Sequence, residues 1–182
     1  MQLHRALAAG ALGMSLVSAS PSLARAQISF GLGGGVTSPT SRLSDGYKSG
    51  YNVLATLGVA FLRVDAMFNQ LDDKLDPSGH TQIWTVNANL VANLMPRSSP
   101  IVPYLIAGAG YYNNQYRVTA SGSTIVGSGS TSFHDFGLNG GAGLRVNLAG
   151  IGVFGEARYH YVFQSGFHSQ FIPITVGVVF GR

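Results

Sequence analysis

The side chains best suited to chemistry lie at alternate positions near the end of the chain, as Glu156, Arg158 and His160. In a β-strand this spacing places all three on one face. A histidine oriented by a carboxylate can act as a general base toward a hydroxyl nucleophile, and His168-Ser169 supplies a second histidine with a hydroxyl. These residues raise the hypothesis of a catalytic site with a base, a nucleophile and an orienting acid.

A structural interpretation explains the same residues more simply. Glu156 is the only glutamate of the chain, and arginines on the same face of a sheet would hold it in an ion pair. Arginine and aspartate also alternate earlier in the chain, and a further arginine lies on the polar face of another segment. We therefore predict a network of ionisable side chains without a catalytic role, formed by Arg63, Asp65, Arg145, Glu156, Arg158 and His160.

Two other motifs could bind ligands. Asp72, Asp73 and Asp76 offer the oxygen ligands that hard divalent cations prefer, but they lack the D-x-D-x-D-G spacing of a calcium loop. The glycines of residues 31–35 resemble a phosphate-binding loop only superficially, because no G-x-x-x-x-G-K-[ST] motif and no helical pattern follow. We expect a solvated loop and a glycine-rich strand at these positions, and we predict neither a metal nor a cofactor.

The composition excludes several classes of protein. The chain has 182 residues, of which 46% are hydrophobic and 10% charged, and it has no cysteine. This balance excludes a disordered chain, and the missing cysteines exclude disulfides, thiolate metal sites and cysteine nucleophiles. The 11 lysines and arginines are spread singly along the chain, so we expect no nucleic-acid partner. So few charges are unusual for a surface that only water covers.

The elements that must position these side chains are strands. Eight segments alternate apolar residues with polar or small ones, and beyond residue 26 no apolar run approaches the length of a membrane-spanning helix. In the third segment, for example, Leu62 and Val64 alternate with Arg63 and Asp65. The predicted strands are residues 28–37, 51–59, 62–69, 84–94, 104–112, 136–147, 153–161 and 172–180.

Alternation alone does not say which face of the sheet is enclosed. In a soluble sandwich or lipocalin-like barrel, the apolar face would form the core and the polar face would meet water. Here the polar face is rich in glycine and asparagine, whereas soluble strands place long charged side chains there. Small residues suit the narrow lumen of an eight-stranded barrel. We therefore predict an all-β fold, an eight-stranded antiparallel up-and-down transmembrane β-barrel with its apolar face toward lipid.

Two further patterns favour a membrane barrel. Connections at 39–50, 72–77, 117–132 and 164–171 are longer than the turns near 59–61 and 148–151, although the 95–102 connection breaks the rule. Aromatic residues on the apolar face gather at the long-loop ends of the strands, where a girdle at the lipid headgroups would lie. The predicted interfacial girdle consists of Tyr51, Phe68, Trp84, Tyr111, Phe136 and Tyr161.

The first 26 residues have the pattern of an export signal. Arg5 provides a basic start, residues 6–17 form a short run of small apolar residues, and Ala24-Arg25-Ala26 is an A-x-A cleavage site. We predict a signal peptide at residues 1–26 and an outer-membrane barrel domain at residues 27–182. The mature chain would be exported through the inner membrane by this cleaved signal.

The mature chain resembles the small outer-membrane β-barrel domains of OmpA/OmpX type, most specifically over residues 103–112, 155–159 and 173–180. The resemblance implies a location in the outer membrane, with outer-membrane lipids and the assembly machinery as partners. It also implies that a closing strand with an aromatic near its end is the signal for assembly, which maps onto Gly177 and Phe180. Here Gly181-Arg182 follow that aromatic residue.

Three functions fit these observations. We expect a non-enzymatic barrel with a structural or surface-interaction role, a lumen filled by side chains and loops exposed outside the cell. The alternative is a barrel enzyme that modifies outer-membrane lipids, with His160 or His168 as its base, or a carrier of small hydrophobic molecules. A soluble lipocalin-like binder is the third.

Overall fold

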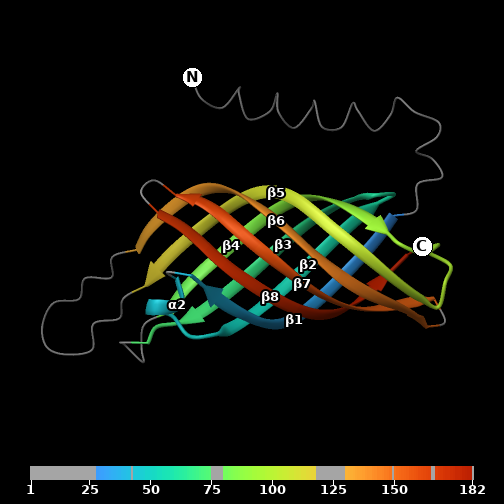
Figure 1. Cartoon of the computed structure of the whole chain (residues 1–182), viewed down its shortest axis with the longest axis horizontal. Coiled ribbons are helices and arrows are strands. Elements are labelled where there is room, and N and C mark those ends of the chain that lie inside the picture. Colours follow the sequence, from blue (N-terminus) through green and yellow to red (C-terminus); the bar gives the residue numbers. More distant parts are fainter. Residues whose placement is uncertain are drawn as a thin grey trace, which may run out of the picture.

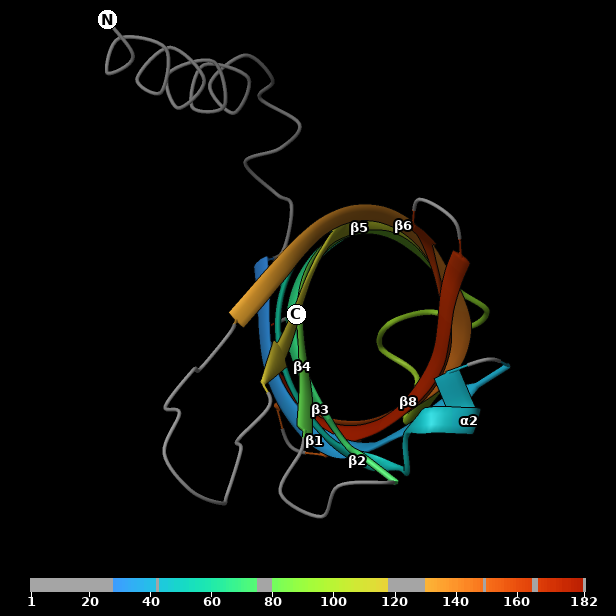
Figure 2. The ribbon, with the colours of Figure 1, turned by 90° about the vertical axis from the view of Figure 1, so that its left-hand side faces the viewer.

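Eight strands close into a barrel. The computed structural model describes residues 28–41, 43–74, 80–117, 130–148, 150–164 and 167–181; the predicted signal at residues 1–26 lies outside these ranges. Each strand pairs antiparallel with the next, and β1 also pairs with β8 to close the sheet. Figure 1 shows the strands tilted across the barrel, and Figure 2 shows their ring from one end. The predicted eight-stranded antiparallel up-and-down topology is confirmed.

One short helix accompanies the strands in the described part of the chain, in the connection between the first two strands. None of the described helices is long and apolar enough to cross a membrane. The bounds are β1 (Ile28–Thr40), α2 (Leu43–Gly46), β2 (Gly50–Val59), β3 (Leu62–Asp72), β4 (His80–Asn93), β5 (Ile101–Arg117), β6 (Ser130–Leu148), β7 (Ile151–Gln164) and β8 (Phe167–Phe180).

The two faces of every strand differ in the way that the alternation predicts. In β3, Leu62 and Val64 are exposed, whereas Asp65 and Met67, which follow them on the other face, are buried. Large apolar side chains cover the outside of the barrel, and Val176 on β8 keeps 59% of its surface exposed. The buried polar side chains, among them Asn52, Thr85 and Glu156, point into the lumen. The apolar face is therefore the outside of the barrel.

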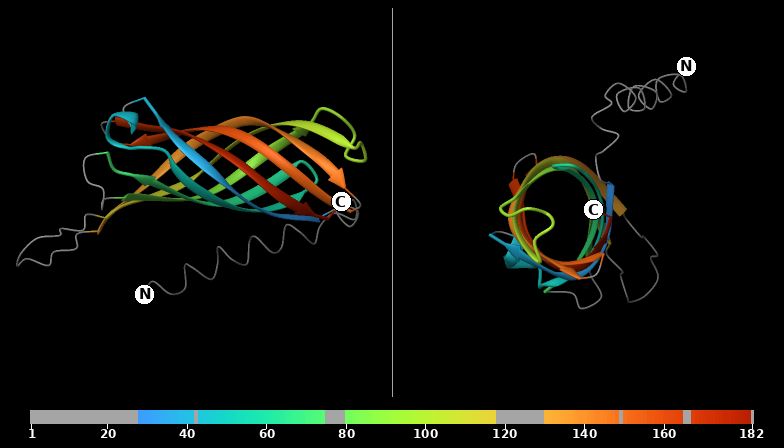
Figure 3. Two further views of the ribbon diagram at one scale, coloured as in Figure 1. Left: turned by 90° about the horizontal axis from the view of Figure 1, so that it is seen from below. Right: turned by 90° about the vertical axis from the view of Figure 1, so that its right-hand side faces the viewer.

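The two ends of the barrel differ. At one end, which we call the short-turn end, residues 60–61, 94–100 and 149–150 connect the strands. At the other, the long-loop end, the connections are residues 41–49, 73–79, 118–129 and 165–166, and α2 lies here. Both ends appear in Figures 1 and 3, with the end of the chain at the short-turn end.

The predicted loop at 164–171 is wrong. The strands β7 and β8 continue to Gln164 and from Phe167, and they pair directly across this region. The same extension lengthens β4, β5 and β6 toward the long-loop end. Alternation was lost from the sequence here because Phe171 is apolar yet faces inward, where it is completely buried.

An apolar layer closes the lumen near the long-loop end. Its members come from five different strands and are almost fully buried; they are Leu71, Ile83, Tyr112, Val162 and Phe171. Leu43 at the start of α2 and Tyr47 after it pack against this layer. A second group of buried apolar side chains, Leu54, Met67 and Phe154, fills part of the lumen elsewhere. Together with the polar residues they leave the interior largely filled.

Candidate functional site

The centre of the lumen holds a closed cluster of four charged side chains. Arg63 and Asp65 come from β3, and Glu156 and Arg158 come from β7 on the opposite wall. Arg63 Nε lies 3.0 Å from an Asp65 oxygen, and Arg63 Nη2 lies 2.9 Å from Glu156 Oε2. Arg158 Nη1 lies 2.8 Å from Asp65 Oδ2, and its Nη2 lies 2.9 Å from Glu156 Oε1. Each guanidinium therefore contacts both carboxylates.

Burial makes this balance of charge important. The side chains of Asp65, Glu156 and Arg158 are at most 1% exposed, and that of Arg63 is 13% exposed. Two positive and two negative groups cancel within the cluster. Taking these charges out of water is costly, and only their mutual contacts and further hydrogen bonds offset that cost.

Neighbouring side chains supply those hydrogen bonds. The hydroxyl of Tyr104 on β5 donates to Glu156 Oε2 at 2.8 Å, and Asn89 Nδ2 on β4 donates to Asp65 Oδ2 at 2.8 Å. Tyr104 was not among the residues of the predicted network. The sequence does place the hydroxyl of Tyr104 on the polar face of its segment. Alternation, however, does not show where along the barrel axis a side chain lies, so it could not identify Glu156 as the partner.

Arg145 does not belong to this cluster, although the sequence reasoning placed it there. Its position pairs with Phe154, two residues nearer the short-turn end than Glu156. Among the described residues, no carboxylate forms an ion pair with Arg145. The sequence correctly predicted that Arg145 lies on the inner face of its strand. Its position along the barrel axis, nearer the short-turn end, separates it from the carboxylates.

His160 also lies outside the ion pairs. Its imidazole is fully buried, its Nδ1 lies 2.8 Å from the hydroxyl of Tyr112, and its ring stacks on Phe171 at 4.8 Å between centroids. It therefore contacts two members of the apolar layer, Tyr112 and Phe171, and makes none of the ion pairs of the charged cluster. The alternating spacing correctly predicted the inner face for His160. In the structure, however, His160 lies nearer the long-loop end than the carboxylates do.

The residues of the catalytic hypothesis are not assembled into one site. His168 is exposed on the outer face, where its ring lies 5.0 Å from that of Tyr161. The adjacent Ser169 points inward, and its hydroxyl donates to Gln164 Oε1 at 2.8 Å. Neighbouring residues of a strand face opposite sides, so His168 cannot activate Ser169.

The outer aromatic residues form three contacting groups. The rings of Tyr51 and Phe68 lie 6.0 Å apart, and those of Phe68 and Trp84 lie 4.7 Å apart. Further around the barrel, Tyr111 contacts Phe136 at 6.0 Å. His134 stacks on Tyr111 and extends this second group, while Tyr161 contacts the ring of Phe163. All of these rings lie on the outer face toward the long-loop end.

The remaining candidates have no site geometry. Asp72 is exposed at the end of β3, Asp73 forms an isolated bridge with Tyr47, and Asp76 lies outside the described residues. Within the described ranges, no group of acidic or histidine side chains could hold a metal ion. The glycines of residues 31–35 lie within β1, as the sequence indicated.

The two residues predicted as an assembly signal, Gly177 and Phe180, lie on the closing strand. Phe180 is exposed on the outer face and pairs with Phe30, while Gly177 pairs with Gly33. A Cβ at Gly177 would come within 2.3 Å of the Leu32 carbonyl oxygen and 2.7 Å of the Phe154 ring. Gly177 therefore permits close packing at the seam of the barrel.

A family model for an outer membrane protein beta-barrel domain matches residues 9–180. The chain belongs to this family. A comparison of the sequence with curated proteins gave no match. The family match confirms the predicted family of outer-membrane barrels. The apolar outside of such a barrel is its lipid-facing surface.

Solved structures show the same fold at low sequence identity. Neisserial surface protein A is 15% identical, with a TM-score of 0.62 over 85% of this chain and 96% of that one. A major outer membrane protein from Thermus thermophilus is 15% identical, with a TM-score of 0.57 over 87% and 100%. The N-terminal barrel of Pseudomonas aeruginosa OprF is 13% identical, with a TM-score of 0.52 over 86% and 97%.

A substitution in the barrel wall beside Tyr104 tests whether this side chain stabilises the charged cluster. A Cβ at Gly143 would lie 2.3 Å from Tyr104 Cζ and 2.4 Å from its hydroxyl, so Gly143→Ala must displace the ring that donates to Glu156. We expect a loss of about 1 to 3 kcal/mol of unfolding free energy in detergent, from overpacking and the broken hydrogen bond.

Gly155→Ala is the matched control for this substitution. Gly155 lies on the adjacent strand and faces outward, where an added Cβ meets no atom within 4 Å. We expect a change of at most about 0.5 kcal/mol. Urea unfolding of both variants checks the prediction, and equal stabilities of the two would contradict it.

Proposed function

We propose that this chain is a structural or surface-interaction barrel of the outer membrane, with a lumen that does not conduct and loops that face outside the cell. The observation that supports this most strongly is the filled interior. The apolar layer, which includes Leu71, Ile83 and Phe171, lies nearer the long-loop end than the ion pairs of Arg63 and Arg158. Two successive sets of side chains therefore cross the lumen.

The width of the barrel agrees with a closed lumen. An eight-stranded barrel encloses a space that side chains can fill, whereas open aqueous channels occur in barrels with about 16 to 18 strands. The buried ion pairs also fix long side chains across this space. A conformational change that opened a path would have to separate buried charges, which is costly.

The partners that we propose follow from the surfaces. The apolar outside, with aromatic rings toward the long-loop end, suits outer-membrane lipids, and the closing strand with Phe180 suits the assembly machinery. The long-loop end is the surface that would reach other molecules. Export of the chain by a signal peptide at residues 1–26 remains our prediction.

Reconstitution into planar bilayers tests the closed lumen. We expect no stable conductance steps from refolded protein, because the apolar layer and the ion pairs block the path. A porin with about 16 strands in the same bilayers is the positive control. Heat-dependent gel mobility in detergent shows beforehand that the barrel is folded. Ohmic steps whose frequency rises with the amount of folded protein would disprove the proposal.

A further inference from the structure

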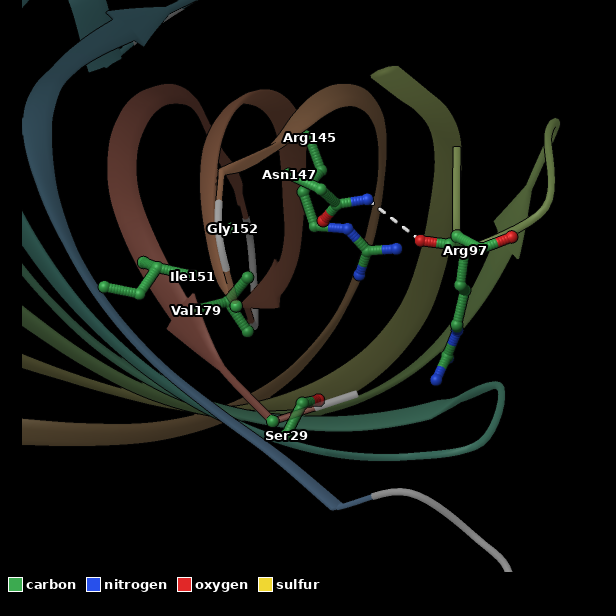
Figure 4. A pocket seen from close by; sticks show the side chains of 10 residues that line it. Ser29, Arg97, Arg145, Asn147, Ile151, Gly152 and Val179 are labelled. Carbon is green, nitrogen blue, oxygen red and sulfur yellow. Dashed lines mark hydrogen bonds between the residues drawn. The ribbon is translucent and has the colours of Figure 1, made fainter. Parts of the chain in front are cut away.

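The lumen opens at the short-turn end into a cavity with a basic lining. The cavity measures about 260 Å³, and its polar lining consists of Ser29, Arg97, Ser98, Arg145 and Asn147. Figure 4 shows the side chain of Arg145 projecting into it from β6, with Arg97 on the facing connection. This connection, residues 94–100, curls over the opening of the barrel in Figure 3.

Within the described residues, no carboxylate forms an ion pair with either of these arginines. The carboxylates of the lumen cluster, on Asp65 and Glu156, each contact both of the cluster's own arginines. Arg145 Nε is buried without a hydrogen-bond partner, while Arg97 donates to the carbonyl of Ala60. Among the described residues, the cavity therefore carries excess positive charge.

Asn147 holds the connection that carries Arg97. Asn147 Nδ2 donates to the carbonyls of Arg97 at 2.9 Å and Ser99 at 2.6 Å, and its backbone amide donates to Pro100. Asn147 follows Arg145 by two residues on β6, so it fixes the connection that carries Arg97 beside Arg145. Figure 4 shows the bond from Asn147 to Arg97.

A glycine makes room for Arg145. A Cβ at Gly152 would lie 2.9 Å from Arg145 Cδ and 2.7 Å from Val179 Cγ1, so Gly152 lets the stem of Arg145 pass along β7. The basic cavity is thus built from defined contacts rather than from mobile surface arginines. Two like charges held near one cavity repel each other unless an anion lies between them.

We propose that this cavity binds a phosphate group. Guanidinium groups donate forked hydrogen bonds that match phosphate oxygens, and a phosphate monoester carries about −1.5 to −2 charge near pH 7, which balances the two arginines. The hydroxyls of Ser29 and Ser98 line the same cavity. The cavity is smaller than typical drug-sized pockets, which begin near about 300 Å³, and so fits a small anion or a lipid headgroup.

NMR of the refolded barrel in uncharged micelles at low salt tests this proposal. We expect inorganic phosphate to shift the amide signals of residues 94–100 and 145–152 saturably. Arg97→Gln and Arg145→Gln should each weaken this binding by about tenfold or more, because each removes a charge-assisted contact. The control Lys74→Gln, at the long-loop end, should bind phosphate as the unmodified protein does.

A second titration identifies the source of the phosphate. Short-chain phosphatidic acid is compared with short-chain phosphatidylcholine in the same micelles. Saturable shifts with phosphatidic acid alone support a lipid headgroup, whereas shifts with inorganic phosphate as well support a small anion. If neither probe gives saturable shifts, or if the Arg97→Gln and Arg145→Gln variants respond like the unmodified protein, the proposal is overturned. Arg97 lies in a connection outside the strands, so its variant remains informative if Arg145→Gln does not fold.

Discussion

Glu156→Gln is expected to lower the free energy of unfolding in detergent by roughly 3 to 5 kcal/mol, the usual cost of removing one partner of a buried ion pair. Glutamine keeps the size of the side chain and still accepts the hydrogen bond from Tyr104, so the loss comes from charge. Arg63 and Arg158 would then share only Asp65, leaving one buried positive charge in excess. Urea titration of folded barrel, followed by heat-dependent gel mobility, measures the loss.

A second substitution separates charge balance from lost contacts. Adding Arg63→Met to Glu156→Gln removes the excess charge and leaves the pair of Asp65 and Arg158, which lie 2.8 Å apart. We expect the double variant to be less destabilised than the sum of the two single variants, as coupling within one network requires. Asp72→Asn, on an exposed carboxylate, is the control, with a change within about 0.5 kcal/mol. Additive effects would mean that charge balance does not hold the cluster.

The faces of the strands could be predicted from the sequence because they depend on local alternation. A residue such as Val64 shows its orientation through its immediate neighbours, Arg63 and Asp65, without any knowledge of the other strands. Lipid requires an uninterrupted apolar face, so the signal is strong where the strands cross the apolar band.

The extended strand ends could not be predicted in this way. Near the start of β8, the exposed residue is the polar His168, whereas the buried residues are the polar Ser169 and the apolar Phe171. Beyond the apolar band that faces lipid, the outer face of a strand need not be apolar. The apolar layer in the lumen requires apolar residues on the inner face here. The usual contrast between an apolar outer face and a polar inner face therefore disappears. The sequence therefore indicated a loop where β8 begins.

Contacts across the lumen were only partly predictable. They depend on the stagger between strands, which accumulates around the barrel and is not encoded in any single segment. That stagger brings Arg63, near the start of β3, to Glu156 in the middle of β7. It leaves Arg145 near the mouth and His160 beside Tyr112, although all of these share the inner face.

Val176→Arg is the second large effect that we expect, because it places a charge on the lipid-facing side of the barrel. Val176 is exposed on the outer face of β8, and it pairs with Gly34 and Gly155 in the middle of their strands. Arginine at the middle of the bilayer costs about 2 to 4 kcal/mol in barrels of this kind. We expect this loss of folding free energy in phospholipid vesicles, or a failure to insert.

Ser38→Arg introduces the same side chain at a different depth and is the matched control. Ser38 is exposed on β1, two residues beyond Val36, whose partner is Tyr51 of the aromatic groups. The cost of a charge falls to about 0 to 1 kcal/mol near the interface, so this variant should insert and remain stable. The difference between the two variants measures the depth of the apolar band. Equal stability of both in vesicles would mean that the outer apolar face does not contact acyl chains.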